Sequence, residues 1–244
     1  SIITSFYLKP KDGGALPSYI AGQYITVRMP TKDGSTTMRN YSLSDKPGQD
    51  YFRISVKREV GAKADTPKGY VSNTLHDAIN VGDTLEIGPP CGEFFLNTND
   101  KHERPLVLLA AGVGITPIFS ILQTALEAMP DREIILIHGC LNKDVQPFKN
   151  TLDALATKHS NLTVHYRYNE ATDGEDKADT NCSGGFIDAA LIESLMPSRH
   201  ADYYFCGPKP FMVNIYHELL AWGIPGNQVH FEFFGPREEL ERKA

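Results

Sequence analysis

The sequence predicts a two-domain protein, with an antiparallel β-barrel in residues 1–103 and an α/β domain with a parallel sheet in residues 104–244. The first observation is length, because 244 residues, 41% of them hydrophobic, exceed a usual single domain and can fill two cores. The second is a change of pattern at the polar segment 101–104. Short alternating segments and turns precede this segment, whereas longer apolar runs and helical patterns alternate after it.

The N-terminal domain is expected to consist mainly of strands and turns. Segments 20–28 and 51–57 alternate apolar with polar residues, as half-buried strands do. A single short helix is expected over 71–79. Turn signals separate the strands at residues 12–14, 32–34, 46–48 and 81–83. Many short strands with regularly spaced turns favour a small antiparallel barrel.

The C-terminal domain is expected to alternate strands with helices, which is typical of βαβ units and a parallel sheet. Its predicted strands cover 105–110, 133–138, 162–168, 202–206 and 228–233, and its predicted helices cover 117–128, 146–158, 188–195 and 210–222. An acidic segment runs from Glu170 to Asp179 and is followed by Ser183, Gly184 and Gly185. We expect this segment to be a solvated surface loop.

Composition excludes several classes of protein. A net charge of −6 and a pI near 5.7 argue against a nucleic-acid-binding surface. No apolar run approaches the ~18–20 residues of a membrane span, so no membrane partner is expected. The four cysteines are spread without C-x-x-C or iron–sulfur spacing, which favours a reduced, cytoplasmic protein. The histidines show no ligand spacing, and no metal site is expected.

Residues 1–8 are not expected to belong to a signal or transit peptide. The chain starts with Ser1 rather than methionine, in a segment that already alternates like a strand. We expect such a start in a piece of a longer protein.

The most informative stretch is a glycine turn between the first strand and first helix of the second domain. Its residues are Gly112, Val113, Gly114, Ile115, Thr116 and Pro117. Such a turn lets backbone N–H groups approach a diphosphate, and proline is tolerated in the first turn of a helix. Pro117 replaces the third Rossmann glycine, and the second strand ends without an acid. The sequence therefore predicts a dinucleotide turn of another type, with an ordinary βα turn as the alternative.

Two further motifs lie in the first domain. Arg39, Asn40, Tyr41 and Ser42 end a strand and could bind a phosphate, stack on a planar ring and hydrogen-bond a ring nitrogen. Gly69, Tyr70, Val71 and Ser72 form a second glycine turn at a helix start, suited to a phosphate. The alternatives are a strand with polar residues at its end and a simple helix N-cap.

These motifs, in this order, resemble those of the ferredoxin-reductase-like flavoprotein family: R-x-Y-S, G-x-x-S, G-x-G-x-T-P and the late Cys206-Gly207-Pro208. Within it, the chain looks most similar to the FAD/NAD reductase half of flavohaemoglobins, the nitric oxide dioxygenases. That match is carried by residues 5–10, 22–24, 39–44, 56–59 and 230–236. Two departures are the absence of a globin half and of the strand that normally precedes Ile2.

The resemblance implies roles for the flavin-side residues. Arg39 and Ser72 would hold the FAD pyrophosphate, with Asn40, Gly69, Tyr70 and Val71 beside it. Tyr41 would stack on the flavin, Ser42 would lie near N5, and Phe234 would cover the other face. Tyr24 and Lys57 would contact the adenosine side or the diphosphate. Phe233, Gly235 and Pro236 would complete the flavin site from the C-terminal tail.

The resemblance also implies roles on the nucleotide side. The turn from Gly112 to Pro117 would bind the pyridine-nucleotide diphosphate, and Cys206, Gly207 and Pro208 would flank the nicotinamide. Glu232 resembles the acid at the flavin–haem junction. Tyr41, Ser42, Cys206, Glu232 and Phe234 are thus the candidate catalytic residues. A buried core cysteine is the alternative for Cys206, and core strand aromatics are the alternative for Phe233 and Phe234.

The implied function is hydride transfer from NADH to FAD, followed by single electrons to an acceptor, favoured to be the haem of a flavohaemoglobin that detoxifies nitric oxide. Haem itself is expected only if a globin domain is present in the parent protein. NADH is favoured over NADPH because segment 139–144 lacks arginine, although Lys143 and Arg167 are near. The alternatives are a free-standing NAD(P)H:flavin or ferredoxin-type reductase and a non-catalytic nucleotide-binding redox sensor.

Overall fold

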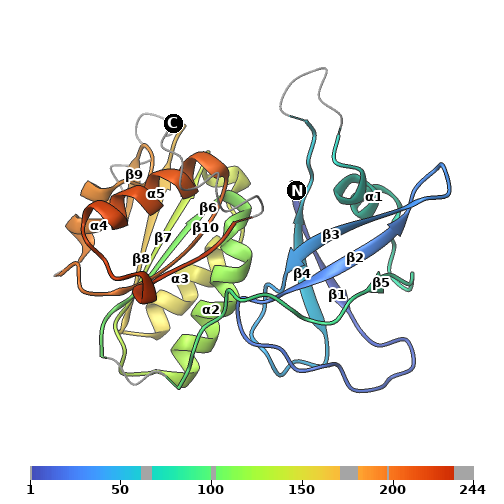
Figure 1. Cartoon of the computed structure of the whole chain (residues 1–244), viewed down its shortest axis with the longest axis horizontal. Helices are drawn as coiled ribbons and strands as arrows, with labels where there is room; N and C mark the ends of the chain where they lie inside the picture. The colour runs from blue at the N-terminus through green and yellow to red at the C-terminus, as the bar shows by residue number, and fades with distance from the viewer. Residues whose placement is uncertain (1, 62–67, 100–102, 171–180, 197, 234–244) are drawn as a thin grey trace.

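The computed structural model describes residues 2–61, 68–99, 103–170, 181–196 and 198–233. Two halves lie side by side, an antiparallel β half and an α/β half (Figure 1). This arrangement confirms the predicted fold class. Within the described ranges, no helix has the length and apolar character needed to cross a membrane.

The antiparallel half contains two small sheets. One pairs β1 (Ile3–Leu8) with β4 (Phe52–Lys57), and the other has the order β3 (Thr36–Ser42), β2 (Tyr24–Pro30), β5 (Glu86–Ile87). An isolated bridge between Leu43 and Ile54 joins them. The inward residues of both sheets and of helix α1 (Tyr70–Ala78) form one core. The alternation in the sequence is therefore the alternation between core and surface.

The α/β half is built on a six-stranded parallel sheet with the order β11-β10-β6-β7-β8-β9. Its strands are β6 (Leu106–Ala111), β7 (Ile134–Cys140), β8 (Leu162–Tyr168), β9 (Cys182–Gly184), β10 (Asp202–Cys206) and β11 (Val229–Glu232). Its helices are α2 (Ile115–Ala128), α3 (Lys149–Lys158), α4 (Ala189–Leu195) and α5 (Lys209–Ala221), with 3-10 turns at Gly112–Gly114, Lys143–Val145 and Gly226–Gln228.

The predicted alternation is confirmed, with one correction. Ser183 and Gly184 were expected in a surface loop, but they belong to the edge strand β9, which pairs with β8. Three residues are too few to show an alternating pattern, so only the pairing reveals this strand. The predicted acidic positions 171–180 lie outside the described residues.

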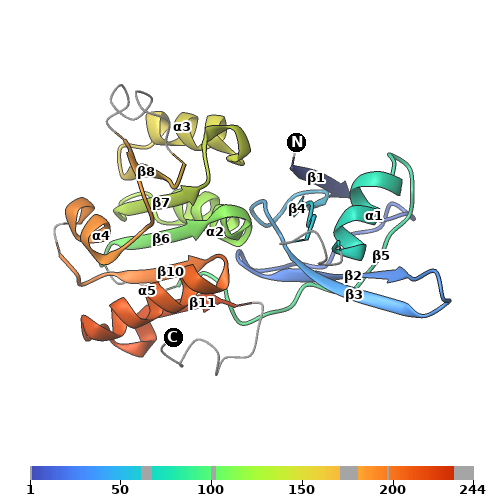
Figure 2. The ribbon, with the colours of Figure 1, turned by 90° about the horizontal axis from the view of Figure 1, so that it is seen from above.

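Helices cover both faces of the parallel sheet (Figures 1 and 2). Helices α2 and α3 pack with one set of alternate strand residues, and α4 and α5 pack with the other set. The central strands are consequently buried on both faces, which explains their unbroken apolar runs.

The two halves share part of a core. Ala21, Phe94 and Leu96 of the first half are buried in the same cluster as Ile118 and Ile121 of α2. Figure 2 shows α2 as the helix beside the antiparallel half. Helix α2 therefore connects the core of the parallel sheet to the antiparallel half.

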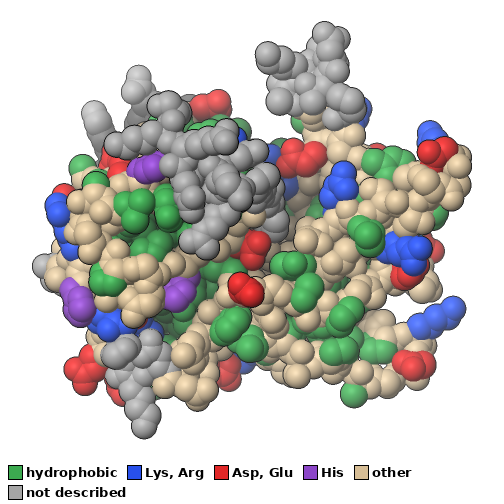
Figure 3. All heavy atoms as spheres, in the orientation of Figure 1, with side chains coloured by type: hydrophobic (Ala, Val, Ile, Leu, Met, Phe, Trp, Pro, Cys, Tyr) green, Lys and Arg blue, Asp and Glu red, His purple; other side chains and the backbone are tan. Residues whose placement is uncertain are grey.

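On the face drawn in Figure 3, acidic and basic side chains are interspersed over both halves without a stripe of one sign.

Candidate functional site

The strand order of the parallel sheet reverses between β6 and β10. From β6 the chain proceeds outward to β7, β8 and β9, and then returns to β10 on the other side of β6. In open α/β sheets, ligands bind outside the carboxyl ends of the strands at such a switch point. The glycine turn that follows β6 meets the Cys206-Gly207-Pro208 segment here, which begins with the last residue of β10.

The two glycines of this turn are needed for different reasons. Gly112 has φ +54°, a left-handed conformation that side chains disfavour, and has open space around its Cα. Gly114 instead lies against the backbone of Cys206, so that a Cβ there would overlap its carbonyl and lie 2.7 Å from the nitrogen of Gly207. Thr116 donates its hydroxyl to the carbonyl of Val113 at 3.0 Å, which closes the turn before Pro117.

Three sequence motifs line one small cavity of about 230 Å³ between the halves. Its lining consists of Arg39, Asn40, Tyr41, Ser42, Ser55, Lys57, Glu59, Gly69, Tyr70, Val71, Ser72, Val113 and Thr116. Residues from β3, β4, the start of α1 and the glycine turn are thus brought together. Ser55 and Glu59 were not predicted as site residues: Ser55 belongs to no motif, and Glu59 was noted only as the end of the segment 56–59 that carries the resemblance.

The small cavity suits a planar, negatively charged cofactor. The Ser42 hydroxyl is buried and has no hydrogen-bond partner among the residues that the structure describes, so it is available to a ligand atom. Tyr41 is half-buried beside it, and burial raises the pKa of its phenol to about 12, so the ring stays neutral. Arg39 is exposed, and within the described ranges its guanidinium donates to two groups of its own strand, the Thr37 hydroxyl and the Met38 carbonyl.

The start of α1 supplies a different kind of contact. The Ser72 hydroxyl donates to the Gly69 carbonyl at 3.1 Å and accepts from the Glu59 amide at 3.2 Å, so it fixes the turn. The first amides of a helix have no acceptor within the helix, and they favour a phosphate. Because Gly69 to Ser72 line the small cavity, these amides lie at its edge. Through its bonds to Gly69 and Glu59, Ser72 therefore fixes the backbone of this anion site, besides any direct contact of its hydroxyl with a phosphate.

A second, larger cavity of about 660 Å³ adjoins the first. It is lined by Ile2, Ile3, Lys57, Ala111, Gly112, Val113, Gly139, Cys140, Leu141, Val145, Asn169, Phe186, Ile187, Pro208, Pro210, Phe211 and Asn214. Most of these follow the carboxyl ends of β6, β7, β9 and β10. Lys57 and Val113 line both cavities, so a ligand in the large cavity can reach one in the small cavity.

Near the switch point lies Glu232, which pairs in register with Cys206 across β11 and β10. Burial raises the pKa of its carboxyl to about 7. Its charge also raises the pKa of the fully buried Cys206 thiol, after the larger effect of burial.

Tyr24, predicted to contact the flavin, does not line the small cavity. Its ring lies against Gly92, and the Cys91 thiol and then Glu232 contribute to its raised pKa.

His138 is a buried polar residue that the sequence analysis missed. Tyr168 donates to the side-chain oxygen of Gln146, so the Gln146 amide nitrogen faces Nδ1 of His138, at 3.5 Å. Nε2 therefore carries the proton and donates to the Gly112 carbonyl at 3.1 Å. Burial lowers the pKa of His138 to about 4, which keeps the ring neutral. A histidine in the apolar strand 133–138 was the only signal in the sequence.

The C-terminal aromatic residues are only partly described. Phe233 packs against the core cluster on the α4 and α5 side, in agreement with the alternative of a core aromatic. Phe234, Gly235 and Pro236 lie outside the described residues. Cys206 is fully buried, so its contact with a ligand could come only through its backbone or through movement of its neighbours.

Comparison with known proteins identifies the family. Residues 3–96 match the oxidoreductase FAD-binding domain, and residues 108–217 match the oxidoreductase NAD-binding domain. The solved FAD/NAD-binding domain of nitric oxide dioxygenase from Vibrio cholerae is 32% identical, with a TM-score of 0.83 over 97% of this chain and 94% of that one. The chain belongs to the FAD- and NAD-binding reductase domains of flavohaemoproteins.

Other members of this family are longer than the chain. A flavohemoprotein of Halalkalibacterium halodurans is 46% identical over 98% of this chain, which spans 57% of that relative. A flavohemoglobin of Malassezia yamatoensis, solved with FAD and haem, is 27% identical with a TM-score of 0.76, over 96% of this chain and 56% of that one. The chain is therefore an FAD- and NAD-binding oxidoreductase module that spans little more than half the length of these relatives.

Proposed function

We propose that this reductase module transfers hydride from NADH in the large cavity to FAD in the small cavity. The observation that carries the proposal is the adjacency of the two cavities, which share Lys57 and Val113. The two flavin motifs line the small cavity, Gly112 and Pro208 line the large one, and the glycine turn contributes Val113 to both and Thr116 to the small cavity. We also propose residues 1–103 as the FAD-binding domain and residues 104–244 as the NAD-binding domain.

Several residues of the small cavity would hold the flavin. Ser42 offers its unpartnered hydroxyl to a ring nitrogen, and Tyr41 offers a flat, neutral face. Arg39 and the first amides of α1 would bind the diphosphate, with Lys57 nearby. When bound, FAD accepts a hydride and releases electrons singly. The chain's contribution is position and exclusion of water, so no acid–base pair is needed at this step.

The large cavity would hold the nucleotide. The turn from Gly112 to Pro117 would bind its diphosphate, and Gly207 and Pro208 would flank the nicotinamide close to Val113. NADH is the proposed coenzyme, because Arg167 already donates to the Phe186 carbonyl at 3.0 Å and to the Ser183 hydroxyl at 2.8 Å. A 2′-phosphate would compete with these bonds for the guanidinium.

The test is anaerobic stopped-flow reduction of the purified chain after loading with FAD. NADH is expected to bleach the flavin absorbance, at a rate that saturates with concentration, and NADPH is expected to react at least ten times more slowly at equal concentration. Replacement of Arg39 by Ala should weaken FAD binding by about 10- to 100-fold, as expected for loss of a charge-assisted hydrogen bond. A chain that binds FAD but is not bleached by either coenzyme would contradict the proposal.

For the parent protein we propose delivery of the electrons to the haem of a globin domain, and nitric oxide dioxygenase activity. The support is the name and length of relatives such as the Halalkalibacterium flavohemoprotein, of which the chain spans 57%. The test is to mix the NADH-reduced chain anaerobically with a ferric globin domain and to follow the haem absorbance. Reduction of free flavin or ferredoxin, but not of the haem, would favour the free-standing reductase instead.

A further inference from the structure

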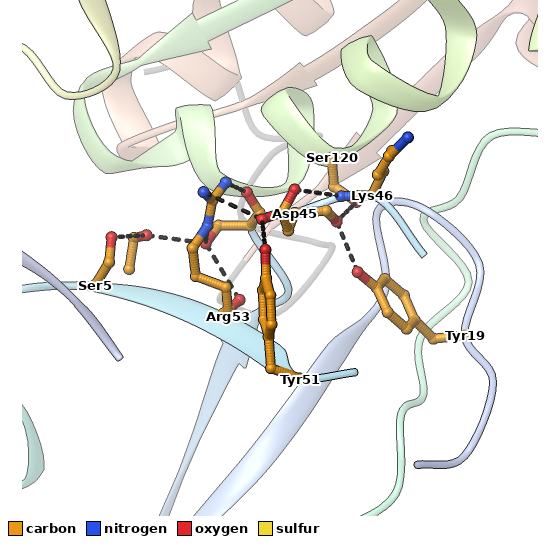
Figure 4. Close-up of polar contacts among 9 residues, drawn as sticks. Ser5, Tyr19, Asp45, Lys46, Tyr51, Arg53 and Ser120 are labelled. Carbon is orange, nitrogen blue, oxygen red and sulfur yellow. Dashed lines mark hydrogen bonds and ion pairs between the residues drawn. The ribbon is translucent and has the colours of Figure 1, made fainter. Parts of the chain in front are cut away.

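A polar cluster lies where the two halves meet, outside both cavities (Figure 4). The Asp45 carbonyl accepts hydrogen bonds from Tyr19 at 2.7 Å and from Ser120 of α2 at 2.6 Å. Its carboxylate forms an ion pair with Arg53 at 3.2 Å, and the two side chains are only 9% and 11% exposed. Tyr51 donates to the same carboxylate at 2.9 Å. The cluster therefore joins three segments of the antiparallel half to α2.

Arg53 continues the link into the α/β half. Its guanidinium carbon lies 5.4 Å from the ring centre of Phe119 and 5.2 Å from that of Phe148. These two rings stack on each other at 4.6 Å and 6°. A planar guanidinium suits both the aromatic rings and the fork of hydrogen bonds that Arg53 donates to the Ser44 backbone and side chain.

The backbone of Phe148 supports the same conclusion. Among the described residues that are not glycine, Phe148 is the one with a positive φ, at +61°. A bulky side chain in this conformation is strained, and such strain persists where the surroundings impose it. The contacts of its ring with Phe119 and Arg53 hold this residue in place.

The cluster sits close along the chain to both candidate binding motifs. Asp45 follows Ser42 by three residues, and Ser120 follows Thr116 by four residues, which is one turn of α2. The bond between the Ser120 hydroxyl and the Asp45 carbonyl thus connects the flavin strand with the nucleotide helix by a short, rigid path. Hydride transfer depends steeply on the position of the reacting atoms, and an error of about 1 Å can cost 100-fold in rate.

We propose that Asp45 and Arg53 are positioning residues, which hold the start of α2 against the end of β3 and thereby set the distance between the two bound cofactors. This inference rests on the proposed function of the two cavities. Neither Asp45 nor Arg53 lines a cavity, and the cluster approaches the small one through Ser44, whose hydroxyl accepts from Arg53 at 3.2 Å and bonds to the cavity-lining Ser55 at 2.9 Å. We therefore expect the cluster to act mainly on the alignment of the two sites and much less on the affinity of either one.

The test replaces Arg53 by Met, which keeps a long apolar side chain beside the two stacked rings but removes the charged fork. We expect at least a tenfold fall in the rate of flavin reduction at saturating NADH. The FAD content and the dissociation constant of NAD⁺ should stay within about twofold of the starting protein. Amide hydrogen exchange in the first half of α2 should become faster, in the FAD-free chain as well. Arg53→Lys keeps the charge without the fork and should give an intermediate rate.

The matched control is Lys46→Ala, which breaks an ion pair across the same junction, Lys46 to Glu127 at 2.7 Å. These side chains are 37% and 65% exposed, so loss of their ion pair should change neither the rate of flavin reduction nor the amide hydrogen exchange of α2. If Arg53→Met fails to fold, Ser120→Ala removes a single hydroxyl of the cluster. It should slow flavin reduction and speed the hydrogen exchange of α2 by smaller factors, with the cofactor affinities again unchanged.

Two outcomes would overturn the inference. One is an Arg53→Met protein with the reduction rate and α2 exchange of the starting protein. The other is a loss of FAD or NAD⁺ affinity as large as the loss of rate, since the cluster would then act on binding. Failure of the unaltered chain to react with NADH would instead refute the proposed function, and the exchange of α2 in the FAD-free chain would still decide whether the cluster holds this helix.

Discussion

Two buried aspartate–arginine clusters are found in the described part of the chain, and they connect different parts of the fold. At the amino end of the parallel sheet, Asp202 forms ion pairs with Arg104 at 2.9 Å and with Arg132. Arg132 also donates to the Arg104 carbonyl at 2.8 Å. At the junction of the halves, Asp45 pairs with Arg53. The first cluster joins the starts of neighbouring strands in one sheet, whereas the second crosses from one half to the other.

This difference separates stability from alignment. The Asp202 cluster ties together the starts of β6, β7 and β10, which would have to come apart before that sheet unfolds. The Asp45 cluster could loosen while each half keeps its own core. Ion pairs of similar burial should therefore have different consequences: loss of the first should lower stability, and loss of the second should mainly change the rate of hydride transfer.

The largest expected effect is that of Asp202→Ala. Removal of one partner from a buried ion pair leaves uncompensated charge, here on two arginines, and typically costs about 3–5 kcal/mol. The free energy of unfolding can be followed in urea through Trp222, the single tryptophan, which lies at the end of α5 and contacts Tyr203 of β10. Protein that remains folded should reduce its flavin at the usual rate.

A matched control for this prediction is Glu86→Ala. Glu86 pairs with Arg28 at 3.0 Å, but the side chains are 67% and 52% exposed, so the loss should be below about 1 kcal/mol. If Asp202→Ala slows hydride transfer without loss of stability, the contrast between the two clusters is wrong.

A half-buried acid sharpens the comparison, because partial burial alone raises the pKa of Glu232 from 4.5 to about 7. Between these two values the folded chain keeps a proton that the unfolded chain has lost. Stability contributed by the neutral acid is therefore complete below pH 4.5 and is lost as the pH rises to 7. The shift corresponds to roughly 3 kcal/mol.

Glu232→Gln keeps the shape and removes the titration. Urea unfolding of the two proteins at several pH values should show the original chain losing stability relative to the variant from pH 4.5 to 7, and no further divergence above pH 8. Parallel curves over this range would mean that Glu232 ionises normally.

The two ends of the parallel sheet are held together differently. Ion pairs of Asp202 join the strands at the amino end, whereas at the carboxyl end the backbone of Gly114 packs directly against that of Cys206. Gly114→Ala would push a Cβ into the backbone of Cys206, and overpacking of this kind typically costs about 1–3 kcal/mol. Gly112→Ala meets no atom and should cost only the strain of φ +54°, about 1 kcal/mol. NAD⁺ titration should show the larger loss of affinity for Gly114→Ala, and an equal loss for both would refute this distinction.

The sequence could predict the binding motifs because each is local. The turn from Gly112 to Pro117 and the strand end from Arg39 to Ser42 are recognisable within a few residues, and the structure brings them to one cavity. The strand and helix alternation was equally readable, because every central strand is buried on both faces. The short edge strand β9 was missed because pairing, and not pattern, defines it.

The two aspartate–arginine clusters could not be predicted in this way. Ser120 and Asp45 are 75 residues apart, and Arg104 and Asp202 are 98 apart. Neither pair has a local signature, since lone polar residues near strand ends are usually exposed. His138 was missed for the same reason: its partners come from the glycine turn and from the segment after β7. Such contacts depend on the packing of whole elements.

The smallest expected effect concerns Phe148 in the Asp45 cluster, and it separates backbone strain from ring contact. Phe148→Ala and Phe148→Gly both remove the ring that faces Arg53 and Phe119. They differ only in a Cβ, which is unfavourable at φ +61°. The Gly variant should therefore be more stable than the Ala variant by about 1 kcal/mol, and glycine is also preferred to alanine at a helix N-cap, the position that Phe148 holds in α3. If the ring positions Arg53, both variants should nevertheless reduce flavin equally slowly. A rate that followed their stability instead would show that the cluster acts only by keeping the chain folded.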